Sequence, residues 1–163
     1  MPDIVIIAHN IRSTHNIGSL FRTAEGFGVT HLYMSGYTPY PAMVDDNRLP
    51  HISGKISAQI HKTALGAESH VPFSVSELPP LKELRSQGYR LVALEQAPHS
   101  QALESYSPPE KIALLIGEEV NGIENQLLAE CDDVIEIRMV GLKESFNVSV
   151  ATGIALFALT TSK

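Results

Sequence analysis

Short apolar runs alternate along this chain with longer stretches in which apolar residues recur every three or four positions. The runs are continuous rather than alternately polar, which is typical of strands buried on both faces of a parallel sheet. The longer stretches have the period of amphipathic helices. The pattern predicts strands over residues 3–8, 31–34, 71–75, 90–94, 111–116 and 133–137, and helices over 17–27, 53–65, 81–87, 125–130 and 146–163.

Alternating strands and helices predict the fold class, an α/β domain with a mostly parallel sheet and helices on both faces. In such sheets ligands bind beyond the carboxyl ends of the strands. Unusual polar segments follow four of the predicted strands, after Ala8, Leu94, Ile116 and Ile137. The proline-rich stretch 37–50 is a long predicted loop, a kind of segment that is often functional. We therefore expect the functional site at this edge of the sheet.

Two polar motifs stand where a core-facing pattern favours Leu or Val. The first places Asn16, Gly18 and Arg22 at the start of an apolar helix, and the second is the Ser-Phe-Asn-Val-Ser segment 145–149. Polar groups at such positions must be hydrogen-bonded or hydrated, so they indicate a ligand site. A second interpretation stays open, because Asn and Ser also cap helices. Arg22 is either a solvated surface residue or a cation held near a phosphate or a developing alkoxide.

Gly117 and Glu119, just after the predicted strand 111–116, form a third signal. Taken alone, this glycine could be a turn residue and this glutamate a surface carboxylate. No group of His and Cys has metal-ligand spacing, so we expect no metal. No GxGxxG or phosphate-loop pattern supports a dinucleotide site.

The composition fits one globular domain. A chain of 163 residues can bury a core, and its apolar (44%) and charged (18%) fractions exclude a disordered chain. We expect a single domain over residues 1–163, without a membrane span or a signal peptide. The single cysteine, Cys131, excludes an internal disulfide and fits the reducing cytoplasm, where we expect the protein to be located.

The net charge of −6 argues against a general affinity for nucleic acid, which would require a strong basic excess. It does not exclude a local basic patch. The residues that could form one are Arg12, Arg22, Arg48, Lys55, Lys62 and Arg138.

Together, the motifs resemble those of the SpoU (TrmH-type) RNA 2′-O-ribose methyltransferases of the SPOUT superfamily. Segments 16–24, 115–122 and 137–151 match the three family motifs in order, and 62–68 is also family-like. Each motif alone is weak, but three in order are specific and cover nearly the whole chain. The chain departs from the family at three positions: Glu118 replaces the usual Asn or Pro, Arg138 the usual Pro, and Phe146 the usual Leu or Met.

The resemblance implies a trefoil knot in the C-terminal third, S-adenosylmethionine bound in that knot, and an obligate homodimer. Each active site would take Asn16 and Arg22 from one subunit and the cofactor from the other. The apolar last helix, 148–159, is the candidate interface. The resemblance also implies a minimal catalytic domain without an added RNA-binding domain. The residues that it assigns to the cofactor are Leu94, Gly117, Ile137, Met139 and Ser145.

The implied reaction is methylation of a ribose 2′-hydroxyl in structured RNA. We favour tRNA over rRNA, since a small dimer must grip a compact target across both subunits. A guanidinium keeps its proton in proteins, so we expect Arg22 to stabilise the phosphate and nascent alkoxide rather than act as a base. The implied catalytic residues are Arg22, Asn16, Glu119, Ser145 and Asn147, and the expected RNA contacts are Arg12, Arg22, Lys55 and Arg138.

Two rival functions stay open at this point. One is a non-catalytic knotted dimer that binds RNA or cofactor without methyl transfer. The other is an unrelated flavodoxin-like binder of small molecules, which would require the three motifs to match by chance.

Overall fold

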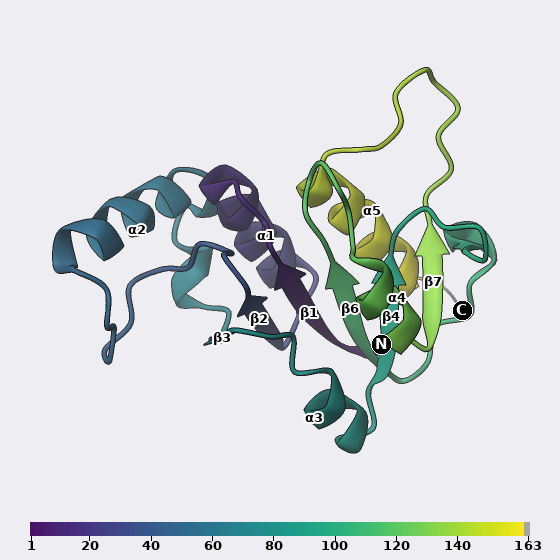
Figure 1. Ribbon diagram of the computed structural model, residues 1–163, viewed down its shortest axis with the longest axis horizontal. Helices are drawn as coiled ribbons and strands as arrows, with labels where there is room; N and C mark the ends of the chain where they lie inside the picture. Colours follow the sequence, from purple (N-terminus) through teal and green to yellow (C-terminus); the bar gives the residue numbers. More distant parts are fainter. Residues whose placement is uncertain (162–163) are drawn as a thin grey trace.

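The computed structural model describes residues 1–161 and contains a seven-stranded sheet in the order β3-β2-β1-β6-β4-β7-β5 (Figure 1). Every neighbouring pair of these strands is parallel. The strands are β1 (Asp3–His9), β2 (His31–Ser35), β3 (Phe73–Ser76), β4 (Arg90–Leu94), β5 (Gln101–Ala102), β6 (Lys111–Ile116) and β7 (Asp133–Glu136). The α-helices are α1 (Thr14–Gly26), α2 (Pro50–Ala64), α3 (Leu81–Ser86), α4 (Asn125–Glu130) and α5 (Val148–Thr161), and two short 3₁₀ helices are η1 (Ala67–Ser69) and η2 (Leu103–Ser105).

Helices cover both faces of the sheet, as the sequence pattern predicts. Alternate side chains of β1 point to opposite faces and enter two separate cores. The larger core joins the sheet to α1, α2 and α5, through fully buried side chains such as Ile6, Phe21, Ile60 and Leu156. The smaller core joins it to α3 and α4, through Ile7, Leu84 and the partly buried Leu128. Burial of one such side chain contributes about 1.5–3 kcal/mol.

The predicted elements agree with the structure except in detail. All six predicted strands exist, but β3 begins at Phe73 rather than at residue 71, and β7 ends at Glu136. The two-residue strand β5 was not predicted, because it is too short to carry a hydrophobic pattern. Helix α1 begins at Thr14 rather than at residue 17, because Ser13 caps it. Helix α2 begins at Pro50 rather than at residue 53, since proline suits the first turn of a helix. Helix α5 begins at Val148, and residues 162–163 of its predicted range lie outside the described residues.

Helices α1 and α2 pack so closely that one position must be glycine. A Cβ atom at Gly18 would lie 2.0 Å from Thr63 Oγ1 and 2.3 Å from the carbonyl oxygen of Ile60. The Thr63 hydroxyl also donates to the carbonyl of His15 at 2.8 Å, which joins the two helices at this point. Gly18 of the first motif therefore serves helix packing.

The strand order at one end of the sheet is unusual, because β7 lies between β4 and β5 although it follows both in the chain. The α/β fold class is confirmed, while the trefoil knot stays a prediction with which this order is compatible. None of the helices within residues 1–161 has the length and apolar character needed to cross a membrane.

Candidate active site

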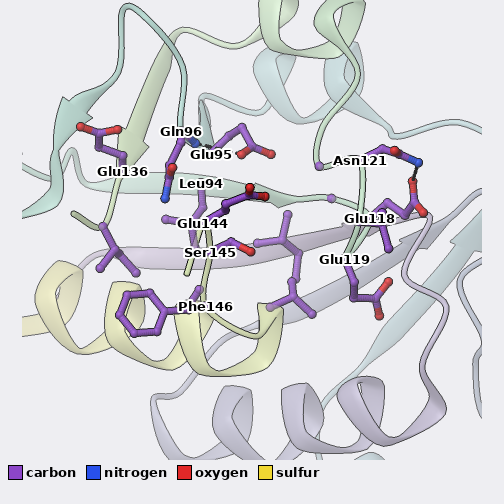
Figure 2. Close-up of a pocket in the computed structure, with 17 residues that line it drawn as sticks. Leu94, Glu95, Gln96, Glu118, Glu119, Asn121, Glu136, Glu144, Ser145 and Phe146 are labelled. Atoms are coloured by element: carbon purple, nitrogen blue, oxygen red, sulfur yellow. Dashed lines mark hydrogen bonds between the residues drawn. The ribbon is translucent and has the colours of Figure 1, made fainter. Parts of the chain in front are cut away.

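The carboxyl ends of β4, β6 and β7 open onto a cavity of about 310 Å³ (Figure 2). The β4–β5 loop, the β6–α4 loop and the segment between β7 and α5 form its walls. Its lining residues are Leu94, Glu95, Gln96, Ile116, Gly117, Glu118, Glu119, Val120, Asn121, Gly122, Glu136, Ile137, Glu144, Ser145, Phe146, Val148 and Ala151. The cavity therefore lies at the edge of the sheet that the sequence predicts.

Most of the predicted cofactor residues meet in this cavity. Leu94, Gly117 and Ile137 lie at the ends of three different strands, Ser145 lies in the segment before α5, and all four line the cavity. Met139 is not among the lining residues. Because the chain brings four of the five predicted residues together from distant segments, the cavity is the candidate cofactor site.

The loop that follows β6 is fixed by Glu95. Its carboxylate accepts hydrogen bonds from the backbone N–H of Ile123 and of Gln96, both at 2.9 Å. Gly122 has a φ of +69°, and a Cβ atom there would lie 2.2 Å from Glu95 Oε2. A Cβ atom at Gly117 would lie 2.6 Å from Ile123 Cγ1. Both glycines are thus required by the loop itself, which agrees with the turn interpretation of Gly117, while its contact with the cofactor stays a prediction.

Glu119 joins the first motif to the rim of the cavity. Its Oε2 accepts from the backbone N–H of Arg12 at 3.1 Å, and its Oε1 accepts from the backbone N–H of Ser13 at 3.2 Å and from Asn16 Nδ2 at 3.0 Å. Partial burial opposes ionisation of this carboxyl, but these three donors outweigh it and lower the pKa of Glu119. Glu119 is therefore an anion that fixes the loop before α1.

The amide of Asn16 continues this network to the last helix. Its Oδ1 accepts from Asn147 Nδ2 at 3.1 Å, while Asn147 Oδ1 accepts from the backbone N–H of Ser149 at 3.0 Å and of Val150 at 3.4 Å. Asn147 thus caps α5, as the capping interpretation of the second motif predicts. Asn16 is not the cap of α1, because Ser13 Oγ fills that role by accepting from the backbone N–H of Asn16 at 3.2 Å.

The two other predicted catalytic residues lie apart from this network. Ser145 lines the cavity, whereas Arg22 does not. Arg22 is exposed on α1, and within residues 1–161 it forms no hydrogen bond or ion pair. Within a single chain, Asn16 is thus bonded to Glu119 at the cavity rim. The guanidinium of Arg22 has no partner among residues 1–161, so it is available to bind another molecule.

The predicted basic residues have different surroundings. Arg12 lies beside Tyr37 and forms an ion pair with Glu118 at 2.9 Å, and these two neighbours, Tyr37 first, raise the pKa of Arg12. Lys55 and Arg138 are exposed. Arg48 is bound within its own loop, where it donates to both carboxylate oxygens of Asp46. Because Asp46 neutralises its charge, Arg48 does not contribute to the basic patch that the sequence allows.

Cys131 is a structural thiol. Its Sγ contacts the carbonyl oxygen of Leu127 at 3.3 Å, and burial raises the pKa of Cys131 to about 11. Such a thiol is a poor nucleophile at neutral pH. Among residues 1–161, no group of three or more His, Cys, Asp or Glu side chains is arranged to hold a metal ion.

Sequence reasoning missed two carboxylates of the cavity, Glu136 and Glu144. Neither carried a signal, because isolated glutamates are common on protein surfaces. Glu118, noted as a departure from the family pattern, also lines the cavity. Its Oε2 accepts from Asn121 Nδ2 at 2.7 Å, in addition to the ion pair with Arg12.

Comparison of the sequence with known protein families identifies the family to which this fold and site belong. Residues 3–157 match the SpoU rRNA Methylase family, and the chain belongs to this family. It is 32% identical over 158 residues to the 23S rRNA (guanosine-2′-O-)-methyltransferase RlmB of Nitrosomonas europaea, a match that covers 96% of this chain and 55% of the relative.

Solved structures share the fold over almost the whole chain. The TrmH/SpoU tRNA modifying enzyme of A. aeolicus superposes with a TM-score of 0.80 at 25% identity, over 98% of this chain and 75% of that one. The AdoMet-bound rRNA methyltransferase from Sinorhizobium meliloti superposes with a TM-score of 0.77 at 22% identity, over 96% of this chain and 55% of that one. The chain spans about half the length of RlmB and of the S. meliloti enzyme.

Proposed function

We propose that this domain transfers a methyl group from S-adenosylmethionine to a ribose 2′-hydroxyl of RNA. The observation that carries the proposal is the network Glu119–Asn16–Asn147, which joins the first, second and third family motifs at the rim of the cavity. Membership of the SpoU family supports it. The names of the relatives support it too, since they describe 2′-O-methylation of rRNA or modification of tRNA.

The cavity fits the cofactor in its position and in the character of its walls. Apolar side chains and backbone at the ends of β4, β6 and β7 would receive the adenosine, and polar groups near Ser145 would face the sulfur and the amino-acid part. The bound cofactor supplies an electrophilic methyl group on a positively charged sulfur. The protein has to hold the ribose, keep it aligned, and accommodate the negative charge that develops on its 2′-oxygen.

The chain's own residues divide these tasks. Glu119 and Asn147 hold the amide of Asn16 in one orientation, because they occupy its Nδ2 and its Oδ1 respectively. Asn16 is therefore a positioning residue that fixes the start of α1, the helix that carries Arg22. Arg22, with an unpaired guanidinium, binds the RNA phosphate and stabilises the nascent alkoxide. The proton of the 2′-hydroxyl leaves to that phosphate or to water as the oxygen takes the methyl group from sulfur.

We infer that the domain works as a homodimer through an exposed apolar stripe on α5 and its approach. The stripe consists of Phe146, Val150, Ile154 and Phe157, with 40%, 51%, 37% and 60% of their surfaces exposed. The spacing of Val150, Ile154 and Phe157 places these three on one side of α5, and Phe146 lies just before the helix begins. An exposed apolar surface of this kind marks a protein interface. In the dimer, Arg22 of one subunit would serve the cavity of the other.

The dimer can be tested by light scattering on the purified protein. Phe157→Asp is expected to yield a monomer, because a charge would be buried in the interface. Val44→Asp is the matched control, since Val44 is fully exposed outside the stripe. A Phe157→Asp protein with the mass of the wild type contradicts the interface.

Structured RNA is the proposed substrate, with tRNA preferred to rRNA. Arg12, Arg22, Lys55 and Arg138 supply the contacts, and the net charge of −6 keeps those contacts few. The affinity should then depend only weakly on salt. The slope of log K against log salt concentration becomes more negative by about 0.7–0.9 for each neutralised phosphate, so few contacts give a shallow slope. An RNA substrate and a reduced Cys131 are both consistent with a cytoplasmic location, which we propose as well.

The test is methylation of total RNA from cells that lack the gene, with labelled S-adenosylmethionine and analysis of the nucleosides. We expect a single 2′-O-methylnucleoside in the tRNA fraction, and its loss with Arg22→Ala. Arg22→Lys keeps the charge but not the planar fork, so it should also lose most of the activity. A mark in rRNA would overturn the choice of tRNA, and cofactor binding without any ribose methylation would favour a non-catalytic dimer.

A further inference from the structure

The lining of the candidate cofactor cavity is strongly acidic. Five of its residues are glutamates, and no Lys, Arg or His of the described chain lines it. They come from the β4–β5 loop, the β6–α4 loop and the segment around 136–144, so no single element accounts for them. The glutamates are Glu95, Glu118, Glu119, Glu136 and Glu144.

Three of these carboxylates are already engaged by the protein. Glu95 and Glu119 accept backbone N–H groups, which satisfy their hydrogen bonding but leave their charge in place. Glu118 is paired with Arg12, and within residues 1–161 Arg12 is the cation that forms an ion pair with this set. The engaged carboxylates therefore leave the cavity with a net negative charge.

The other two carboxylates, Glu136 and Glu144, have no hydrogen bond or ion pair with any residue of the described chain. Figure 2 shows Glu144 near the middle of the cavity, beside Leu94 and Ser145, and Glu136 at one margin. Because no protein cation compensates them, a cationic ligand would gain from their presence.

The two molecules that must occupy the site in turn differ in one charge. The methyl donor has a positively charged sulfur, and its product after methyl transfer has a neutral thioether, while adenosine, ammonium and carboxylate are the same in both. Charges a few ångströms apart near a protein surface interact strongly enough to alter affinity measurably. An acidic cavity therefore distinguishes the donor from the product.

We propose that Glu144, assisted by Glu136, makes this cavity prefer the cationic methyl donor over its neutral product. The inference rests on the proposed function, since it concerns the cofactor of that reaction. The consequence is that methyl transfer lowers the affinity of the cavity for the molecule that it holds. The product therefore dissociates and competes little with fresh donor. The cavity thus distinguishes the two ligands by the charge on the sulfur and not by the size of the methyl group.

The test is titration calorimetry on the whole protein with three ligands. These are S-adenosylmethionine, S-adenosylhomocysteine, and sinefungin, which carries a cationic amine in place of the methylated sulfur. For the wild type we expect the two cationic ligands to bind about tenfold more tightly than the neutral one. Raising the salt concentration should weaken the two cationic ligands and leave the neutral one nearly unchanged.

Variants assign the preference to residues. Glu144→Gln should reduce the preference several-fold, mainly by weakening S-adenosylmethionine, and Glu136→Gln should reduce it less. Glu110→Gln is the matched control, because Glu110 is an exposed residue immediately before β6, at the opposite end of the strand that leads to Gly117. The control should keep the wild-type preference.

The outcomes separate the inference from the function. If the wild type binds all three ligands with equal affinity, or if salt affects them equally, the inference fails while the cofactor site stands. If Glu144→Gln and Glu136→Gln both keep the wild-type preference, these residues are not its source and the inference also fails. If none of the three ligands binds, the inference and the proposed function both fail.

Discussion

Two segments border the cavity, and they differ in how far the protein itself fixes them. The loop before α1 and the first residues of that helix, together called the loop 10–16, are held in place from several sides. They are bound by Glu119, by the Ser13 cap and by Thr38, whose hydroxyl accepts from the backbone N–H of Ile11 at 3.1 Å. Residues 138–146 form no hydrogen bond or ion pair with the rest of the described chain. Figure 1 shows this second segment as a loop that extends away from the sheet between β7 and α5.

The difference indicates a division of labour. A group that has to stabilise charge in a transition state works best when it is fixed beforehand. In the proposed reaction that group is Arg22, and the loop 10–16 fixes the start of the helix that carries it. A segment that covers a ligand gains its contacts when the ligand arrives, so it can remain open in the free protein. The exposed apolar residues Val140 and Leu142 of the second segment are then available to a cofactor-bound or dimeric state.

The largest effect should follow from removing the anchor of the fixed loop. Glu119→Ala leaves three N–H groups without their acceptor and releases Asn16, so we expect methylation to fall by about 100-fold or more. The measurement is the initial rate with saturating cofactor. Glu124→Ala, an exposed change near the same loop, should keep the wild-type rate. If the two variants are equally active, the fixed loop does not matter for catalysis.

The next effect separates capping from positioning at Asn147. Asn147→Asp keeps the oxygen that caps α5 but loses the Nδ2 donor to Asn16, so it should retain stability and lose most activity. Asn147→Ala loses both, and should also lower the free energy of unfolding by about 0.5–2 kcal/mol. Chemical denaturation and methylation rates, measured on the same samples, check the pair. An Asp variant as active as the wild type would show that the bond to Asn16 is dispensable.

Acid should loosen the fixed loop before it affects the open segment. The pKa of Glu119 is lowered in the folded state, so the unfolded state binds a proton more readily. The stabilisation from Glu119 is therefore complete above the ordinary glutamate pKa, about 4.3, and is lost as pH falls through the lower folded pKa. Thermal melts from pH 6 to pH 3 should show a smaller acid-induced decrease in Glu119→Gln than in the wild type. Equal decreases would contradict the assignment.

The smallest effect is expected in the open segment. Leu142 is fully exposed, so Leu142→Ser should change the free energy of unfolding by less than about 0.5 kcal/mol without cofactor. Denaturant titration checks this value. A larger loss would mean that the segment is already packed in the free protein.

The sequence predicts features that depend on local patterns, and it does not predict those that depend on contacts between distant residues. Continuous apolar runs were enough to predict every strand of the described sheet except β5, and the edge of the sheet at which the cavity lies. The family resemblance supplied four predicted cofactor residues that line the cavity, while their roles stay predictions. The capping residue of α1 was not predictable, since Ser13 and Asn16 are both good caps. The choice depends on Glu119, more than one hundred positions away in the chain, which takes the amide of Asn16.

Other misses have equally local causes. Arg48 is a possible member of a basic patch by sequence, but Asp46, two residues away, binds its guanidinium. Glu144 has no pattern around it, and only the folded position of the segment 137–147 places it at the cavity. Long-range side-chain pairing of this kind leaves no trace in a hydrophobic pattern.

Hydrogen exchange with and without S-adenosylmethionine tests the comparison most directly. Amides that lack hydrogen bonds exchange quickly, so residues 138–146 should exchange fast in the free protein and the loop 10–16 more slowly. We predict that the cofactor slows exchange in 138–146 by at least about tenfold and leaves the loop 10–16 unchanged. Equal protection of both segments, or protection of neither, would contradict the account of a fixed catalytic loop beside a segment that the cofactor orders.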